Sequence, residues 1–172
     1  MYLRDSRLIA RALGIIGHRN AAGLGQTRRQ NEIAPAEGEN PMPYIMPLNE
    51  QGAVHAAAAF AKTTNRLQTW MTTASIGPGS LNMVTGAATA TTNRLPVLIF
   101  PSDQFATRIP DPVLQQLEDP TSLDVTVNDA FRPVSRFFDR INRPEQLIPS
   151  LLNGMRVLTD PAETGAVTIA LP

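Results

Sequence analysis

Apolar and polar positions follow two patterns along this chain. Short apolar or Thr-rich runs, most of them bounded by Gly, Pro or Asn, predict β-strands. They lie at residues 13–17, 44–46, 67–75, 95–102, 131–141 and 165–172. Between them, apolar residues recur at helical spacing and predict helices over residues 51–65, 81–94 and 143–160. Pro144 suits the first turn of the last helix, because proline is pre-organised for that position.

The order of these elements predicts the fold class. Strands that alternate with helices, several of them as unbroken apolar runs, are typical of a parallel sheet covered on both faces. We therefore predict an α/β fold of three αβα layers around a central, mainly parallel sheet of about six strands. The chain has 172 residues, enough for one domain and too few for two, so residues 1–172 are predicted to form a single domain. Residues 103–129 read as a long irregular connection with a short helix near residues 112–119.

Composition narrows the possible partners. Fifteen basic and fifteen acidic residues cancel, which argues against nucleic acid or an anionic membrane surface as the main partner. The absence of cysteine excludes disulfides, thiolate nucleophiles and Cys-built metal sites, and no His, Asp or Glu cluster has metal-ligand spacing. No apolar stretch approaches the length of a membrane span. We expect a cytoplasmic protein that holds no metal on its own residues.

Glu50 lies where the second predicted strand ends and a helix begins, in "YIMPLNEQGAVHAAAAFAK". A carboxylate after the good N-cap Asn49 can simply favour the helix dipole. However, the loop that leaves the carboxyl end of a parallel strand is also where ligands bind in α/β proteins. The residues alone leave both interpretations open.

The helices after Glu50 are rich in small residues. Ala53, Ala57 and Ala61 line one stripe that lets another backbone approach closely, either within the core or at a subunit boundary. "SIGPGSLNMVTGAA" places glycines before a helix, but it lacks the Lys-Ser/Thr of a P-loop and has Asn82 where a dinucleotide motif needs glycine. It predicts a tight turn that leads into a helix. His18 and Asn20 follow the first strand, either in a polar turn or in a ligand-facing loop.

Together, "NEQGAVHAAAAFAK" and "TTASIGPGSLNMVTGAATATTNRLPVLIF" resemble the pyrimidine-binding domain of thiamine-diphosphate-dependent enzymes of the acetolactate-synthase type. The resemblance covers nearly the whole chain from Gly14 onward. Within that family, residues 75–172 are most similar to members that hydrolyse a carbon–carbon bond of a cyclic dione in myo-inositol catabolism. The resemblance implies thiamine diphosphate as the cofactor and a small cyclic dione as the substrate.

The resemblance also implies roles for single residues. Glu50 corresponds to the glutamate that shares a proton with N1′ of the cofactor's aminopyrimidine. A second set matches the turn near the cofactor and the subunit boundary: Gly77, Pro78, Gly79 and Asn82. A third set is expected to face the substrate: His18, Asn20, Asp103 and Gln104. Arg19 departs from the family pattern, which has glycine after the histidine.

Members of this family carry a separate domain that binds Mg²⁺ and the diphosphate. No such motif occurs here, so we expect residues 1–172 to be a truncated domain that binds the cofactor weakly on its own and is inactive alone. The implied partners are the missing C-terminal domain and a second subunit, in a homodimer or a dimer of dimers. Two alternatives are the same domain of a carboligase or decarboxylase, and a non-catalytic α/β association module.

Overall fold

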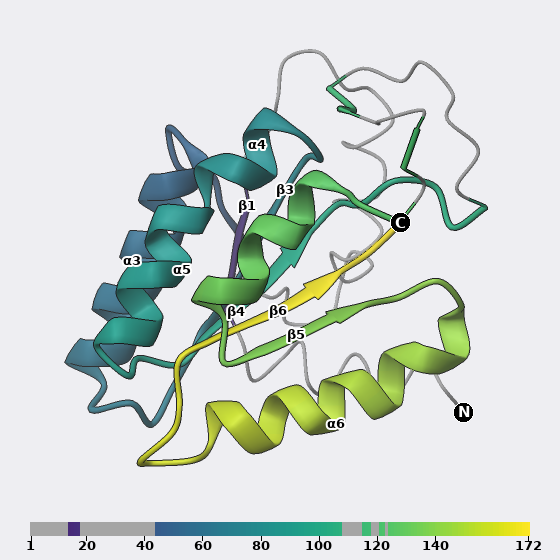
Figure 1. The fold of residues 1–172 in the computed structure, drawn as a ribbon. Helices are drawn as coiled ribbons and strands as arrows, with labels where there is room; N and C mark the ends of the chain where they lie inside the picture. The colour runs from purple at the N-terminus through teal and green to yellow at the C-terminus, as the bar shows by residue number, and fades with distance from the viewer. Residues whose placement is uncertain (1–13, 18–43, 108–114, 118–120, 123) are drawn as a thin grey trace, which may run out of the picture.

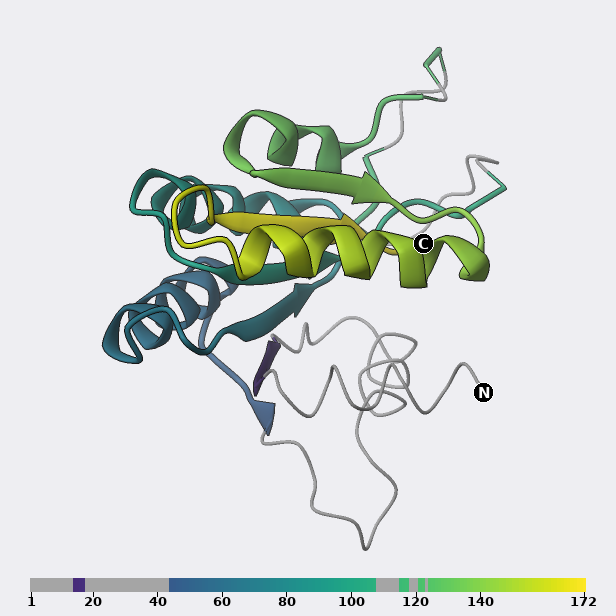
Figure 2. The ribbon, with the colours of Figure 1, turned by 90° about the horizontal axis from the view of Figure 1, so that it is seen from below.

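The structure, a computed structural model, describes residues 14–17, 44–107, 115–117, 121–122 and 124–172. Six strands form one sheet in the order β2-β1-β3-β4-β6-β5, seen from below in Figure 2. All five strand pairings are parallel. The predicted parallel sheet of about six strands is therefore confirmed. The strands are β1 (Gly14–Gly17), β2 (Tyr44–Ile45), β3 (Trp70–Ala74), β4 (Val97–Pro101), β5 (Phe137–Arg140) and β6 (Ala166–Ala170).

Helices cover both faces of the sheet, as the three-layer prediction requires. Helices α3 (Glu50–Thr63) and α5 (Val84–Thr92) lie side by side, and α6 (Leu147–Leu158) lies apart from them (Figure 1). The short helix α4 (Pro78–Asn82) precedes α5. Two 3₁₀ turns complete the set, η1 (Val127–Val134) and η2 (Pro144–Gln146). No helix in these described ranges is long and apolar enough to cross a lipid bilayer.

Two hydrophobic clusters show that the layers lie on opposite faces. Along β4, Val97 and Ile99 pack with the α3–α5 side, while Leu98 between them packs with the α6 side. This alternation follows from the period of two along a strand, which sends successive side chains to opposite faces. Two residues of the small-residue stripe of α3, Ala57 and Ala61, lie within the first cluster, and the third, Ala53, is also fully buried. The stripe therefore forms part of the core on this face of the sheet.

The close approach of α3 and α5 depends on glycine. A Cβ on Gly86 of α5 would lie 2.5 Å from Val54 Cβ of α3 and 2.7 Å from Val54 Cγ1. Since these distances are too short for carbon atoms in contact, the two helices pack together only because position 86 has no side chain.

The prediction of one strand over residues 131–141 was wrong in its first half. The 3₁₀ turn η1 occupies Val127–Val134, and the strand begins only at Phe137. A capping box starts the turn, since Thr126 Oγ1 accepts from Asn128 N (3.2 Å) and Asp129 Oδ2 accepts from Thr126 N (2.8 Å). Phe131 in this turn is fully buried in the core.

Two further predictions differ in detail. The helix expected over residues 81–94 begins earlier, at Pro78, and is divided into α4 and α5 at Met83. The short helix expected near residues 112–119 lies largely outside the described residues.

Candidate functional site

The carboxylate of Glu50 lies at the carboxyl edge of the sheet, on the first residue of α3. Asn49 caps this helix by accepting from Gly52 N at 2.6 Å, which fixes the direction in which α3 leaves β2. Glu50 is only 7% exposed, and Asn82 Nδ2 donates to its Oε2 at 2.9 Å. Two residues predicted to belong to one site, 32 positions apart in the sequence, are thus in contact.

The backbone of the Gly-Pro-Gly turn leaves no room for a side chain at either glycine. Gly77 has φ +76°, in the region that favours glycine, and a Cβ there would overlap the Gln115 carbonyl. Pro78 is the first residue of α4 and is exposed. A Cβ on Gly79 would lie 2.5 Å from Ser75 Oγ and 3.5 Å from Glu50 Oε1. The turn therefore brings α4, and with it Asn82, next to the Glu50 carboxylate.

Asp103 is held in a buried ion pair. Its side chain is 1% exposed, and Arg140 Nε donates to its Oδ2 at 2.6 Å. Its other oxygen accepts from Gln104 N at 2.9 Å. Asp103 thus directs both oxygens to protein groups. Gln104 is half-buried beside it, so the substrate-facing role of these two residues stays a prediction.

Arg140 is a residue that the sequence reading missed. It lies at the end of β5 with its side chain 11% exposed, and it also contacts Thr126 Oγ1 (2.8 Å) and Asp129 Oδ1 (3.3 Å). Burial opposes its charge, but Asp103 and Asp129 raise the pKa of Arg140 above its usual value. The sequence did carry a signal for Arg140. It lies at the carboxyl end of a predicted strand, next to the apolar Ile141, where a charged side chain needs a partner if it is buried.

His18, Asn20 and Arg19 lie outside the described residues, and their predicted places near the site stay predictions. His55 lies on α3 and is half-buried, with its Nε2 3.4 Å from Gln51 Nε2. Among residues 14–17, 44–107 and the later described ranges, no three His, Cys, Asp or Glu side chains could together hold a metal ion.

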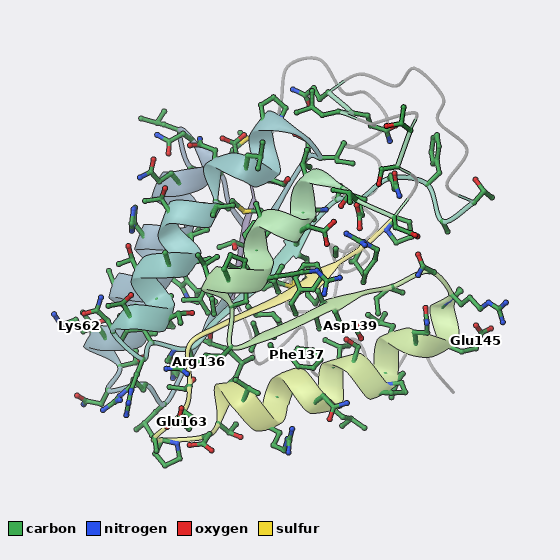
Figure 3. All side chains as sticks on the ribbon, in the orientation of Figure 1. Lys62, Arg136, Phe137, Asp139, Glu145 and Glu163 are labelled. Carbon is green, nitrogen blue, oxygen red and sulfur yellow. The ribbon has the colours of Figure 1, made fainter. Side chains whose placement is uncertain are left out.

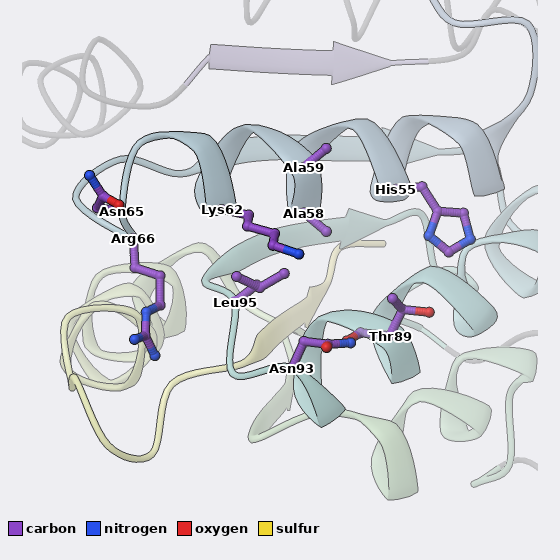
Figure 4. Close-up of a pocket in the computed structure, with 9 residues that line it drawn as sticks. All are labelled: His55, Ala58, Ala59, Lys62, Asn65, Arg66, Thr89, Asn93 and Leu95. Carbon is purple, nitrogen blue, oxygen red and sulfur yellow. The ribbon is translucent and has the colours of Figure 1, made fainter.

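A surface groove of about 610 Å³ runs between α3 and α5, away from Glu50. Figure 4 shows His55 and Lys62 of α3 on one side of it and Thr89 and Asn93 on the other. The described lining includes Lys62, Arg66 and no acidic residue. None of the predicted site residues lines this groove.

Comparison with known proteins identifies the fold family. Residues 5–123 match the family described as "Thiamine pyrophosphate enzyme, N-terminal TPP binding domain", which is more than half of the chain. The chain belongs to this family. The family resemblance expected from Glu50 and the Gly-Pro-Gly turn is therefore confirmed.

Three curated relatives of this thiamine pyrophosphate enzyme domain carry the name 3D-(3,5/4)-trihydroxycyclohexane-1,2-dione hydrolase. The protein of Clostridium tetani (strain Massachusetts / E88) is 52% identical over 169 residues, and that of Geobacillus thermodenitrificans (strain NG80-2) is 53% identical over 169 residues. The hydrolase of Bacillus cereus (strain AH820) is 50% identical over 171 residues. Each match covers 98% of this chain but only 25% of the relative. The chain spans about a quarter of the length of these curated relatives.

Proposed function

We propose that this domain supplies the aminopyrimidine side of a thiamine-diphosphate site in a longer enzyme. That enzyme would hydrolyse a carbon–carbon bond of 3D-(3,5/4)-trihydroxycyclohexane-1,2-dione. The observation that carries the proposal is the Glu50 carboxylate, buried at the start of α3 and held by Asn82 of α4. The shared name and about 50% identity of the relatives support this choice of substrate.

The described residues fit this cofactor. A buried carboxylate can form a strong hydrogen bond with a ring nitrogen, because little water competes for it. The hydrogen bond from Asn82 orients the Glu50 carboxylate, and Gly79 beside it adds no side chain to the space. The site also lies at the carboxyl ends of parallel strands, where α/β proteins bind ligands.

When bound, thiamine diphosphate supplies an electron sink for carbon–carbon bond cleavage. The part played by this chain is to hold a proton at the Glu50 carboxyl next to N1′ of the pyrimidine ring. Asn82 keeps that carboxyl in one orientation, and burial keeps water away from the shared proton. Mg²⁺ and the diphosphate group would be held by another part of the longer chain.

The overall reaction would add one water to the ring and open it to 5-deoxy-glucuronate. Because a neutral dione becomes a carboxylic acid that ionises, turnover releases a proton and can be followed in a weakly buffered solution. We further propose a cytoplasmic enzyme that assembles as a homodimer or a dimer of dimers. Light scattering of the full-length protein tests the assembly, and a monomer at high concentration would contradict it.

The decisive experiment is Glu50→Gln in the full-length enzyme. We expect kcat with the dione to fall at least about 100-fold, because general acid–base catalysis contributes factors of that size. Glu145→Gln is the matched control: Glu145 is also an acidic residue in a first helical turn, but it is exposed beside α6 (Figure 3).

Full activity of the Glu50→Gln variant would contradict a catalytic role and leave a non-catalytic module. A comparison of substrates completes the test. Turnover of pyruvate in preference to the dione would keep the role of Glu50 but replace the hydrolase with a decarboxylase or carboligase.

A further inference from the structure

Arg140 is the centre of a buried network at the carboxyl edge of the sheet. Its Nε donates to Asp103 Oδ2 (2.6 Å), and one terminal nitrogen donates to Thr126 Oγ1 (2.8 Å) and lies 3.3 Å from Asp129 Oδ1. The side chains of Asp103 and Arg140 are 1% and 11% exposed. Arginine suits this position because its planar fork of donors can bind several acceptors at fixed angles.

The network joins segments that are far apart in the sequence. Asp103 follows β4, Thr126 and Asp129 belong to the start of η1, and Arg140 ends β5. The two ends of the connection between β4 and η1 are thus bound to the same guanidinium group. Asp103 N also donates to Leu171 O at 2.6 Å, which anchors this point to the chain beyond β6.

This connection contacts the turn that leads to the candidate site. Ile76, Gln104, Val125 and Thr126 line the same small surface cavity. The Gln115 carbonyl packs directly on Gly77. From Gly77 the chain continues into α4, whose last residue, Asn82, binds Glu50. Gln104 and Thr126, next to Arg140 in this network, thus share a cavity with Ile76, the residue before the turn that leads to α4.

We propose that Arg140 is a positioning residue for the substrate side of this site. Through Asp103 and Thr126, it holds Gln104 and its neighbouring backbone against the turn at Ile76 and Gly77. The expected effect on substrate binding rests on the proposed function. The expected effect on the order of the chain around Gln104 rests on geometry alone. Arg140 touches neither Glu50 nor Asn82, so its loss should affect substrate binding more than cofactor binding.

The test compares Arg140→Gln and Arg140→Lys in the full-length protein. Arg132→Gln is the matched control. Arg132 Nε also binds Asp129, at 2.7 Å, and the guanidinium groups of Arg132 and Arg140 both lie over the Phe138 ring. Unlike Arg140, however, Arg132 has a side chain that is 61% exposed. The first readout is hydrogen exchange of residues 102–107. We expect faster exchange there in Arg140→Gln, since the Asp103 carboxylate would no longer be fixed to accept from Gln104 N, and unchanged exchange in Arg132→Gln.

The second readout separates KM from kcat. We expect Arg140→Gln to raise KM for the dione about tenfold, because a small displacement of a binding group can cost that much or more. The apparent Kd of thiamine diphosphate should stay within about twofold of wild type, which is the ordinary scatter of a neutral substitution. Arg140→Lys keeps the positive charge and the fold but loses the planar set of guanidinium donors. Its KM for the dione should therefore lie between the values of wild type and Arg140→Gln.

Unchanged KM together with unchanged exchange of residues 102–107 in Arg140→Gln would overturn the proposal. So would an equal effect of Arg132→Gln, which would indicate a general charge effect. If the Gln variant does not fold, the Lys variant decides on the same two readouts. If wild type does not open the dione, the proposed function fails, and the exchange readout alone then decides the role of Arg140.

Discussion

The tight packing of Gly79 against Ser75, in the turn that leads into α4, can be tested by substitution. Gly79→Ala would place a Cβ 2.5 Å from Ser75 Oγ but 3.6 Å from Ser75 Cβ. The hydroxyl alone therefore causes the clash, and Ser75→Ala removes it while leaving an ordinary van der Waals contact. The pair forms a double-mutant cycle in which each variant differs from wild type by one or two atoms.

The expected magnitudes follow from these distances. Overpacking of this kind costs about 1–3 kcal/mol, and the better helix propensity of alanine offsets up to about 1 kcal/mol of it. Gly79→Ala should lower the free energy of unfolding by about 1–2 kcal/mol. Ser75→Ala alone should cost about 1 kcal/mol, since it removes a hydroxyl that interacts with the protein. The double variant should be more stable than the sum of the two by about 1–3 kcal/mol.

Urea unfolding of the four proteins measures this coupling, and thiamine-diphosphate binding by the full-length forms measures its effect on the site. Because Asn82 follows Gly79 within α4, Gly79→Ala should also weaken cofactor binding, and Ser75→Ala should restore part of it. Additive costs, within about 0.5 kcal/mol, would show that the Cβ finds room elsewhere and would refute the reasoning.

Two further predictions concern the core and the network. Gly86→Ala should lower the free energy of unfolding in urea by about 1–3 kcal/mol, because its Cβ would lie 2.5 Å from Val54 Cβ. Val54→Ala should restore part of this loss. An unchanged free energy of unfolding in Gly86→Ala would contradict the close packing of α3 and α5. Burial opposes the charge of Asp129, but hydrogen bonds from Arg132 and Thr126 N and the Arg140 charge hold its pKa below the usual value. Its ionised form therefore stabilises the fold above the ordinary Asp pKa of about 3.9, and that stabilisation is lost as the pH falls through the lower folded pKa. The stability difference between wild type and Asp129→Asn should thus be largest at neutral pH and shrink in acid; a difference independent of pH would refute it.

Much of the fold could be predicted because a parallel sheet leaves a strong local signal. The run at Val97–Pro101 is apolar on consecutive positions because both faces of β4 are covered. Residues 131–134 were misread because Phe131 and Val134 are apolar in either conformation. The capping box of Thr126 and Asp129 decides in favour of the turn, and it lies upstream of the segment that looked like a strand.

The candidate site shows where local patterns stop being sufficient. Glu50 and Asp103 are both carboxylates that follow a parallel strand, so the local pattern assigns both the same possible role. The structure separates them by what each one meets: Glu50 accepts from a neutral amide, Asn82, whereas Asp103 is bound to a cation, Arg140, 37 residues later in the chain. That cation arrives only because β6 is placed between β4 and β5, which puts the ends of three strands side by side. A carboxylate that is paired with a buried arginine serves as a structural anchor, since the loss of either partner would leave a buried charge uncompensated. The order of strands, which no local pattern encodes, therefore decides which of the two acids is paired with the buried arginine.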